Sequence, residues 1–202
     1  MCWCRGISYM IITISGTPGS GKSTVAKILV EKLKYERIYT GGIMRDMARE
    51  RGITIEELMR KARTETSIDT EVDHRVRDQA RALEREGKNV LVEGRVQFYH
   101  IPESIKVYMK VEAYEGARRI YQELQSKEAQ QVRNQDPVGS IEELVVKTRN
   151  REEVDSKRYL SLYNVDYRQE SNYDLIIDTT KISAKQTAEK LISAIQQYSP
   201  KQ

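Results

Sequence analysis

The chain has 202 residues, of which 39% are apolar, 32% charged and 7% aromatic, and its net charge is +4. This length and composition fit one globular domain of ordinary size and exclude a disordered chain. The near balance of 34 basic and 30 acidic residues excludes the strong basic field of a dedicated nucleic-acid binder, so any positive potential must be local.

The N-terminal residues give no sign of a targeting segment. No apolar run approaches the ~18 residues needed to cross a bilayer, and residues 1–10 hold no apolar segment long enough for a signal peptide. We therefore expect a cytoplasmic protein. Cys2 and Cys4 cannot complete a four-ligand zinc site by themselves. We expect residues 1–9 to be a disordered extension and residues 10–202 to form a single domain.

The first predicted element is a buried strand at residues 10–15, an apolar and β-branched run that stops at Gly16. A glycine-rich turn follows. From Ser23 onward the apolar residues fall at helical spacing, so the turn leads from a strand into a helix.

Strands and helices then alternate along most of the chain. Capping boxes predict helix starts at Thr54, Ser140 and Ser183. Further apolar runs predict strands at residues 37–39, 89–92, 105–109 and 173–177. This alternation indicates a three-layer α/β fold around a mostly parallel sheet. Residues 115–168 break it, because they are highly charged and contain no convincing strand, and we expect them to form a projecting helical hairpin.

The glycine-rich turn carries a phosphate-binding motif. Its sequence, Gly16-Thr17-Pro18-Gly19-Ser20-Gly21-Lys22-Ser23, matches G-x-x-x-x-G-K-[ST] and is followed by Thr24. The glycines let backbone N–H groups turn toward phosphates, the lysine offsets phosphate charge, and the Ser23 hydroxyl suits Mg²⁺. We predict that residues 16–24 bind ATP and that Ser23 ligates Mg²⁺.

This motif alone does not identify the reaction, because GTPases, motor ATPases and small-molecule kinases share it. A chain of about 200 residues with the motif near its start favours a small kinase. The absence of an N-K-x-D guanine-reading motif argues against a GTPase.

A kinase needs a second site for an anionic acceptor, and two arginines follow predicted strands. Arg45 comes after Thr40-Gly41-Gly42, and Arg95 comes after Glu93-Gly94. Ligands of doubly wound sheets lie outside the carboxyl ends of the strands, and the arginine fork grips phosphate through two hydrogen bonds. We predict acceptor binding by Thr40, Gly41, Arg45, Gly94 and Arg95. The alternative is that each arginine is a solvated surface charge.

A charged stripe lies in the last part of the helical region. Arg151, Asp155 and Arg158 are four and three positions apart, so they share one face of a helix. They are candidates for the site, and the alternative is a solvent-exposed face of ion pairs.

Five segments, in this order, resemble the nucleoside monophosphate kinases, and most closely the archaeal-like type of cytidylate kinase. The matching segments are residues 10–16 running into the motif, Gly41-Gly42-Ile43-Met44-Arg45, Val92-Glu93-Gly94-Arg95, residues 151–159 and residues 173–179.

The resemblance implies a P-loop kinase fold with a five-stranded parallel sheet, a monophosphate-binding segment at about 40–86 and a helical lid at about 115–168. It implies phosphoryl transfer from MgATP to CMP or dCMP. Arg45 and Arg95 would bind the acceptor phosphate, and Arg151, Asp155 and Arg158 would reach the ribose, base or transferring phosphate as the lid closes. The catalytic set is then Lys22, Arg45, Arg95, Arg151 and Arg158.

Two positions depart from the family pattern. Gly42 stands where relatives often carry an acidic residue, and Gln122 and Glu123 lie where relatives place an arginine one turn beyond Arg119. Arg118, Arg119 or Arg133 could supply that charge.

Two rival functions stay open at this point. One is a kinase for another small acceptor, such as a different nucleotide, dephospho-coenzyme A or a small alcohol. The other is a nucleotide-dependent regulatory or RNA-associated protein with weak turnover. We expect a monomer that binds free nucleotides and neither nucleic acid nor membrane.

Overall fold

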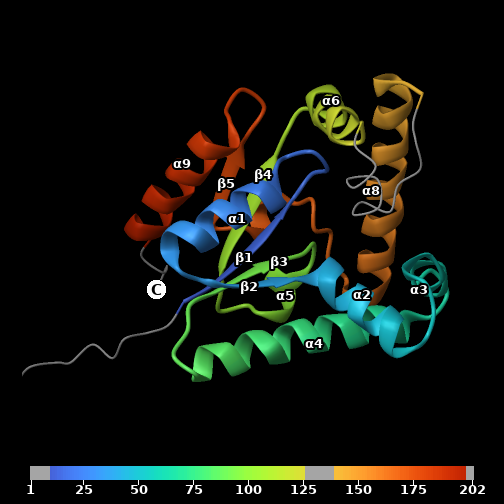
Figure 1. Ribbon diagram of the computed structural model, residues 1–202, viewed down its shortest axis with the longest axis horizontal. Helices are drawn as coiled ribbons and strands as arrows, with labels where there is room; N and C mark the ends of the chain where they lie inside the picture. Colours follow the sequence, from blue (N-terminus) through green and yellow to red (C-terminus); the bar gives the residue numbers. More distant parts are fainter. Residues whose placement is uncertain (1–9, 126–138, 199–202) are drawn as a thin grey trace, which may run out of the picture.

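The computed structural model describes residues 10–125 and 139–198, which are built around a sheet of five parallel strands (Figure 1). The strands lie in the order β2-β3-β1-β4-β5. Their bounds are Ile11–Gly16 for β1, Glu36–Tyr39 for β2, Val90–Glu93 for β3, Ile105–Lys110 for β4 and Leu175–Asp178 for β5. The predicted five-stranded parallel sheet is therefore confirmed.

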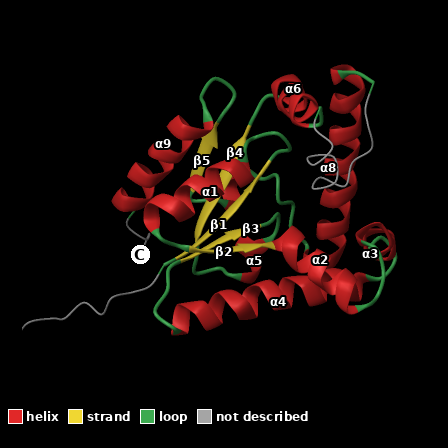
Figure 2. Cartoon of the chain, in the orientation of Figure 1, coloured by secondary structure: helices red, strands yellow, loops and turns green. Residues whose placement is uncertain are grey.

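Helices connect the strands and cover both faces of the sheet (Figure 2). Their bounds are Lys22–Leu33 for α1, Thr40–Glu50 for α2, Ile55–Lys61 for α3, Thr66–Arg85 for α4, Gln97–His100 for α5, Ala113–Glu123 for α6, Ile141–Tyr163 for α8 and Ala184–Gln197 for α9, with a 3₁₀ turn, η1, at Glu170–Asn172. The capping boxes predicted at Thr54 and Ser183 are present. At Ser140 the box is only half formed, because the Glu143 carboxylate accepts from Gly139 N–H instead of from its own cap residue.

Successive side chains of a strand point to opposite faces of the sheet, so each face has its own hydrophobic core. Ile11 of β1 packs into the core beneath α2, α3 and α4, whereas Ile12 and Ile14 pack into the core beneath α1 and α9. The strands therefore form a packed frame, and polar residues lie at their carboxyl ends.

The predicted helical lid region, at about 115–168, contains most of α6 and all of α8. Figure 2 shows α6 beside the upper part of α8, and the two helices pack through Ala117, Ile120 and Leu124 against Leu144. The lower part of α8 packs on the sheet side through Tyr159. The described residues of this region are thus helical, as expected, and α6 packs against α8.

Some expectations fall on residues that the structure does not describe. The predicted extension at 1–9, with its two cysteines, lies outside the described residues, and so does Arg133. None of the described helices is both long enough and apolar enough to cross a bilayer.

Candidate active site

The phosphate-binding loop, residues 16–23, lies between the end of β1 and the first turn of α1. Its lysine folds over it: Lys22 Nζ lies 2.8 Å from the Gly16 carbonyl oxygen and 2.7 Å from that of Thr17. The loop is tied to β4, because Thr17 N–H donates to the Met109 carbonyl at 3.0 Å. The first N–H groups of α1 have no partner within the helix, and with the helix dipole they favour an anion at this point.

At two positions of the loop another backbone segment passes so close that only glycine fits. A Cβ on Gly16 would lie 1.9 Å from the Met109 carbonyl oxygen, and one on Gly19 would lie 2.2 Å from that of Gly116 in α6. Gly16, Gly19 and Gly21 all have positive φ angles, of 145°, 76° and 82°. At Gly21, by contrast, an added Cβ would meet nothing within 4 Å.

Gly19→Ala and Gly21→Ala therefore form a matched pair that separates backbone strain from steric overlap. Gly21→Ala is expected to lower the free energy of unfolding by about 1–2 kcal/mol, the usual cost of a left-handed alanine. Gly19→Ala adds the overlap with Gly116 and is expected to cost about 2–5 kcal/mol. Urea unfolding of both variants checks this, and equal losses of stability would contradict the structure.

A buried carboxylate faces the loop from the end of β3. Glu93 is 4% exposed; its Oε1 accepts a hydrogen bond from Ser23 Oγ, and its Oε2 pairs with the Arg37 guanidinium. Sequence reasoning did not include Glu93 or Arg37 among the site residues. The available signal was an acidic residue at the last position of an otherwise apolar strand.

These donors suit the Mg²⁺ expected with ATP. Mg²⁺ prefers hard oxygen ligands and is commonly held by one or two protein groups together with phosphates and water. Ser23 Oγ and the Glu93 carboxylate provide such oxygens in direct contact with one another. The described residues contain no cluster of three or more metal-binding side chains. The residues present therefore fit a cation shared with phosphates.

The acceptor residues predicted after β2 and β3 are brought together in part. Thr40 Oγ1 donates to the Glu93 carbonyl at 2.8 Å, and a Cβ on Gly94 would lie 2.5 Å from Thr40 Oγ1. Ser15 Oγ at the end of β1 donates to the Arg95 carbonyl at 3.0 Å. Thr40, Gly94 and Arg95 thus lie together at the carboxyl ends of the strands, next to the phosphate-binding loop.

Arg45 is placed differently from Arg95. Its guanidinium carbon lies 5.4 Å from the centre of the Tyr39 ring, and its side chain lines a pocket together with Ile53 and Thr54. Gly41 lies beneath the same ring, since an added Cβ would be 2.8 Å from Tyr39 Cζ. Arg45 and Gly41 therefore lie next to this group of residues, and both contact the Tyr39 ring.

Asp155 of α8 joins the predicted arginines. Its carboxylate lies 3.1 Å from Arg95 Nη2, 3.1 Å from Arg158 Nη2 and 4.0 Å from Arg151 Nε. Arg151, Asp155 and Arg158 share one face of the helix, as their spacing predicted. Asp155 is only 7% exposed, whereas the Arg151 side chain is 49% exposed, so the stripe is buried at Asp155 and open to solvent at Arg151.

Further buried polar residues of α4 extend this cluster and were not found from the sequence. Asp69 Oδ2 lies 3.5 Å from Arg158 Nε. One turn along, Asp73 accepts from Tyr163 Oη at 2.7 Å and from Gln97 Nε2 at 2.8 Å. On the helical pattern these acids are typical surface charges of α4; contacts with residues of both α5 and α8 bury them.

Asp69 gives the stability of the protein a specific pH dependence. Burial raises the pKa of its carboxyl to about 6; Arg158 opposes this shift, and Asp73 and Asp155 add to it. The folded state therefore binds more protons than the unfolded state between about pH 4 and pH 6. The contribution of Asp69 to stability then falls as the pH rises through this range, by on the order of 2–3 kcal/mol.

The variant Asp69→Asn lacks this titration. We measure the change in the free energy of unfolding from pH 4.5 to pH 7 by urea unfolding, and expect this change to be more favourable to the folded state in the variant than in the wild type. The same pH dependence in both proteins would contradict the assignment.

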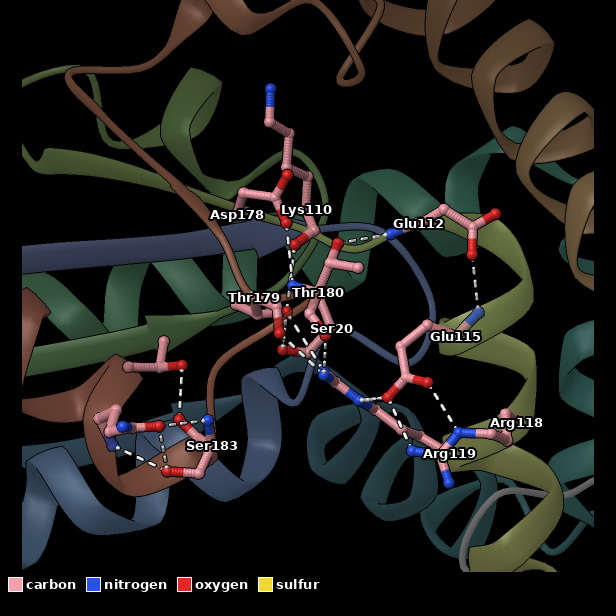
Figure 3. Close-up of polar contacts among 12 residues, drawn as sticks. Ser20, Lys110, Glu112, Glu115, Arg118, Arg119, Asp178, Thr179, Thr180 and Ser183 are labelled. Atoms are coloured by element: carbon pink, nitrogen blue, oxygen red, sulfur yellow. Dashed lines mark hydrogen bonds and ion pairs between the residues drawn. The ribbon is translucent and has the colours of Figure 1, made fainter.

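Arg118 and Arg119, two of the three candidates for the missing lid charge, both pair with Glu115 of the same helix, α6 (Figure 3). The Glu115 carboxylate accepts from Arg118 Nε at 2.7 Å and from Arg119 Nε at 2.7 Å. Arg119 Nη2 also donates to the carbonyl of Thr179 at 2.7 Å and to that of Thr180 at 3.1 Å, beyond the end of β5. Hydrogen bonds from Arg118 lower the pKa of Glu115 to about 2, with burial opposing and Arg119 adding to the shift. Arg119 thereby braces the lid against the last strand; whether it or Arg118 also supplies charge to a phosphate stays a prediction.

The chain is similar to known proteins over nearly its whole length. Residues 12–137 match the model of a family described as an AAA domain. The chain is 38% identical over 186 residues to the cytidylate kinase of Methanocella arvoryzae, covering 92% of this chain and 97% of that protein. It is 36% identical to the cytidylate kinase of Methanothrix thermoacetophila, covering 92% and 98% of the two chains.

Solved structures confirm the fold at lower identity. The shikimate kinase from Acinetobacter baumannii, solved in complex with shikimate, has a TM-score of 0.61 at 20% identity and covers 94% of both chains. The shikimate kinase from Bacteroides thetaiotaomicron has a TM-score of 0.60 at 16% identity and covers 93% of this chain and 98% of its own. At these identities the likeness concerns the fold alone.

Proposed function

The chain belongs to the cytidylate kinase family, and from this premise we propose that it transfers the γ-phosphoryl group of ATP to CMP or dCMP, giving ADP and the corresponding diphosphate. In this reaction an acceptor phosphate oxygen attacks the γ-phosphorus and the bond to the β-phosphate oxygen breaks. Little covalent help is needed from the protein, whose task is to align two anions and neutralise charge.

The observation that carries this proposal is the adjacency of donor and acceptor groups at one sheet edge. The phosphate-binding loop follows Ser15 directly, and the Ser15 hydroxyl is hydrogen-bonded to the backbone of Arg95. Arg95 is in turn paired with Asp155, which also holds Arg158. A phosphate accepted by Arg95 therefore lies beside the phosphates held by the loop.

On the donor side, residues 16–24 hold ATP and Lys22 offsets phosphate charge. Ser23 and Glu93 would hold Mg²⁺, which supplies further neutralisation of the phosphates when it is bound.

On the acceptor side, Arg45 and Arg95 bind the monophosphate, with Thr40, Gly41 and Gly94 shaping the edge. Asp155 now occupies Arg95 and Arg158, so the incoming phosphate takes over interactions that the carboxylate makes in this structure. Arg151 and Arg158 then complete the positive surroundings and exclude water as α8 closes. A monomer acting in the cytoplasm on free nucleotides, and not on nucleic acid, remains part of the proposal.

An acceptor screen tests this function. ADP production from MgATP is measured with CMP, dCMP, UMP, AMP, GMP, dTMP and dephospho-coenzyme A, and without acceptor. We expect a clear optimum with CMP or dCMP. An optimum with another acceptor would replace the proposed substrate, and ATP binding without any acceptor-dependent turnover would overturn the kinase proposal for these acceptors.

A further inference from the structure

Two arginines share one aromatic ring at the end of β2. The guanidinium carbon of Arg37 lies 5.2 Å from the centre of the Tyr39 ring, and that of Arg45 lies 5.4 Å from it. Both distances are within the range of a cation–π interaction. The ring itself rests on Gly41, where the absence of a side chain leaves room for it. Two like charges near one ring repel, so an opposite charge must hold at least one of them.

Glu93 provides that opposite charge. The Arg37 side chain is 21% exposed and its Nη2 pairs with Glu93 Oε2, while the other carboxylate oxygen accepts from Ser23 Oγ. Each oxygen of the carboxylate thus serves a different partner. Arg37 fixes the rotation of Glu93 and offsets its charge where the triphosphate would otherwise meet an unpaired carboxylate.

We propose that Arg37 is a positioning residue that couples the two halves of the site, holding Glu93 for the donor side and, through the ring of Tyr39, Arg45 for the acceptor side. The chain of contacts runs from Ser23 to Glu93, Arg37, Tyr39 and Arg45 without a gap. The acceptor half rests on the proposed function, whereas the donor half requires only that the loop binds MgATP.

The proposal predicts different defects for the two ends of this chain of contacts. Arg37→Met frees the Glu93 carboxylate and removes the guanidinium that packs on the Tyr39 ring and fixes its position for Arg45, so both halves suffer. Tyr39→Leu leaves the pair of Arg37 and Glu93 intact and removes only the ring that holds Arg45. Tyr39→Phe keeps the ring, and Arg37→Lys keeps a cation for both partners, so each conservative variant should recover most of what its partner variant loses.

The test uses two binding measurements on the whole chain. Calorimetry at a fixed ATP concentration gives the Mg²⁺ concentration for half-maximal ATP binding, and a second titration gives the CMP dissociation constant. For Arg37→Met we expect a rise of about tenfold in the Mg²⁺ midpoint and about three- to fivefold in the CMP constant. For Tyr39→Leu we expect the same change in the CMP constant and an unchanged Mg²⁺ midpoint. The matched control is Arg81→Met, since Arg81 of α4 forms an exposed ion pair with Glu103.

A purely structural role for Arg37 gives a different result. If Arg37→Met lowers thermal stability but leaves both constants within twofold of the wild type, the proposal is wrong. It is equally wrong if Tyr39→Leu leaves the CMP constant unchanged. Should the wild type bind MgATP but not CMP, the proposed function and the acceptor half both fail, and the Mg²⁺ midpoint alone decides the donor half.

Discussion

Replacing Lys22 with alanine is expected to lower kcat for CMP phosphorylation by about 10³-fold or more. The Lys22 ammonium lies against the Gly16 and Thr17 carbonyls, inside the loop that we assign to the ATP phosphates. Charge that develops on the transferring group would be offset by this cation, and groups of this kind are each worth several orders of magnitude in phosphoryl transfer. Steady-state kinetics at saturating ATP and CMP measure the effect.

The matched control for this variant is Lys27→Ala. Lys27 lies in the same helix, α1, but is exposed to solvent, so its loss should leave kcat within about twofold of the wild type. A Lys22→Ala protein that is folded and turns over within tenfold of the wild-type rate would contradict the assignment of the loop.

Replacing Arg95 with methionine should produce two separable defects. The first is a fall of about 10²–10³-fold in kcat/KM for CMP, because the acceptor phosphate loses a charged, two-pronged donor. The second is a loss of about 1–3 kcal/mol in the free energy of unfolding, because buried Asp155 loses one of its arginine partners. Kinetics and urea unfolding report on the two defects independently.

The double variant Arg95→Met/Asp155→Asn distinguishes these effects. Removing the carboxylate charge should restore part of the stability, while kcat/KM stays low because the phosphate-binding arginine is still missing. Recovery of both activity and stability in the double variant would show that Arg95 acts only through Asp155, and would contradict its proposed contact with substrate.

The parts of this protein that follow from local sequence were predictable. A run of β-branched residues ending at Gly16, followed by the glycine-rich motif and helical spacing, defines a strand, a loop and a helix without reference to the rest of the chain. The stripe of Arg151, Asp155 and Arg158 was likewise predictable, because helical geometry alone places residues at these spacings on one face.

The parts that depend on packing between distant elements were not predictable. Asp69 and Asp73 follow a surface-like pattern along α4, and contacts with Arg158 and Tyr163 of α8 and with Gln97 of α5 bury them. Arg37 lies in a strand of four residues, and its partner Glu93 is 56 positions away in the chain. No spacing rule connects such residues, since the order β2-β3-β1 that makes β2 and β3 neighbours is a property of the whole sheet.

The central claim is that the site moves a phosphoryl group between two nucleotides instead of releasing it to water. The most direct test follows the reaction of MgATP with CMP by ³¹P NMR, which separates the signals of ADP, CDP and inorganic phosphate. We expect ADP and CDP to appear in equal amounts, with little inorganic phosphate. Inorganic phosphate that forms in step with ADP, without CDP, would show hydrolysis alone and would contradict the claim.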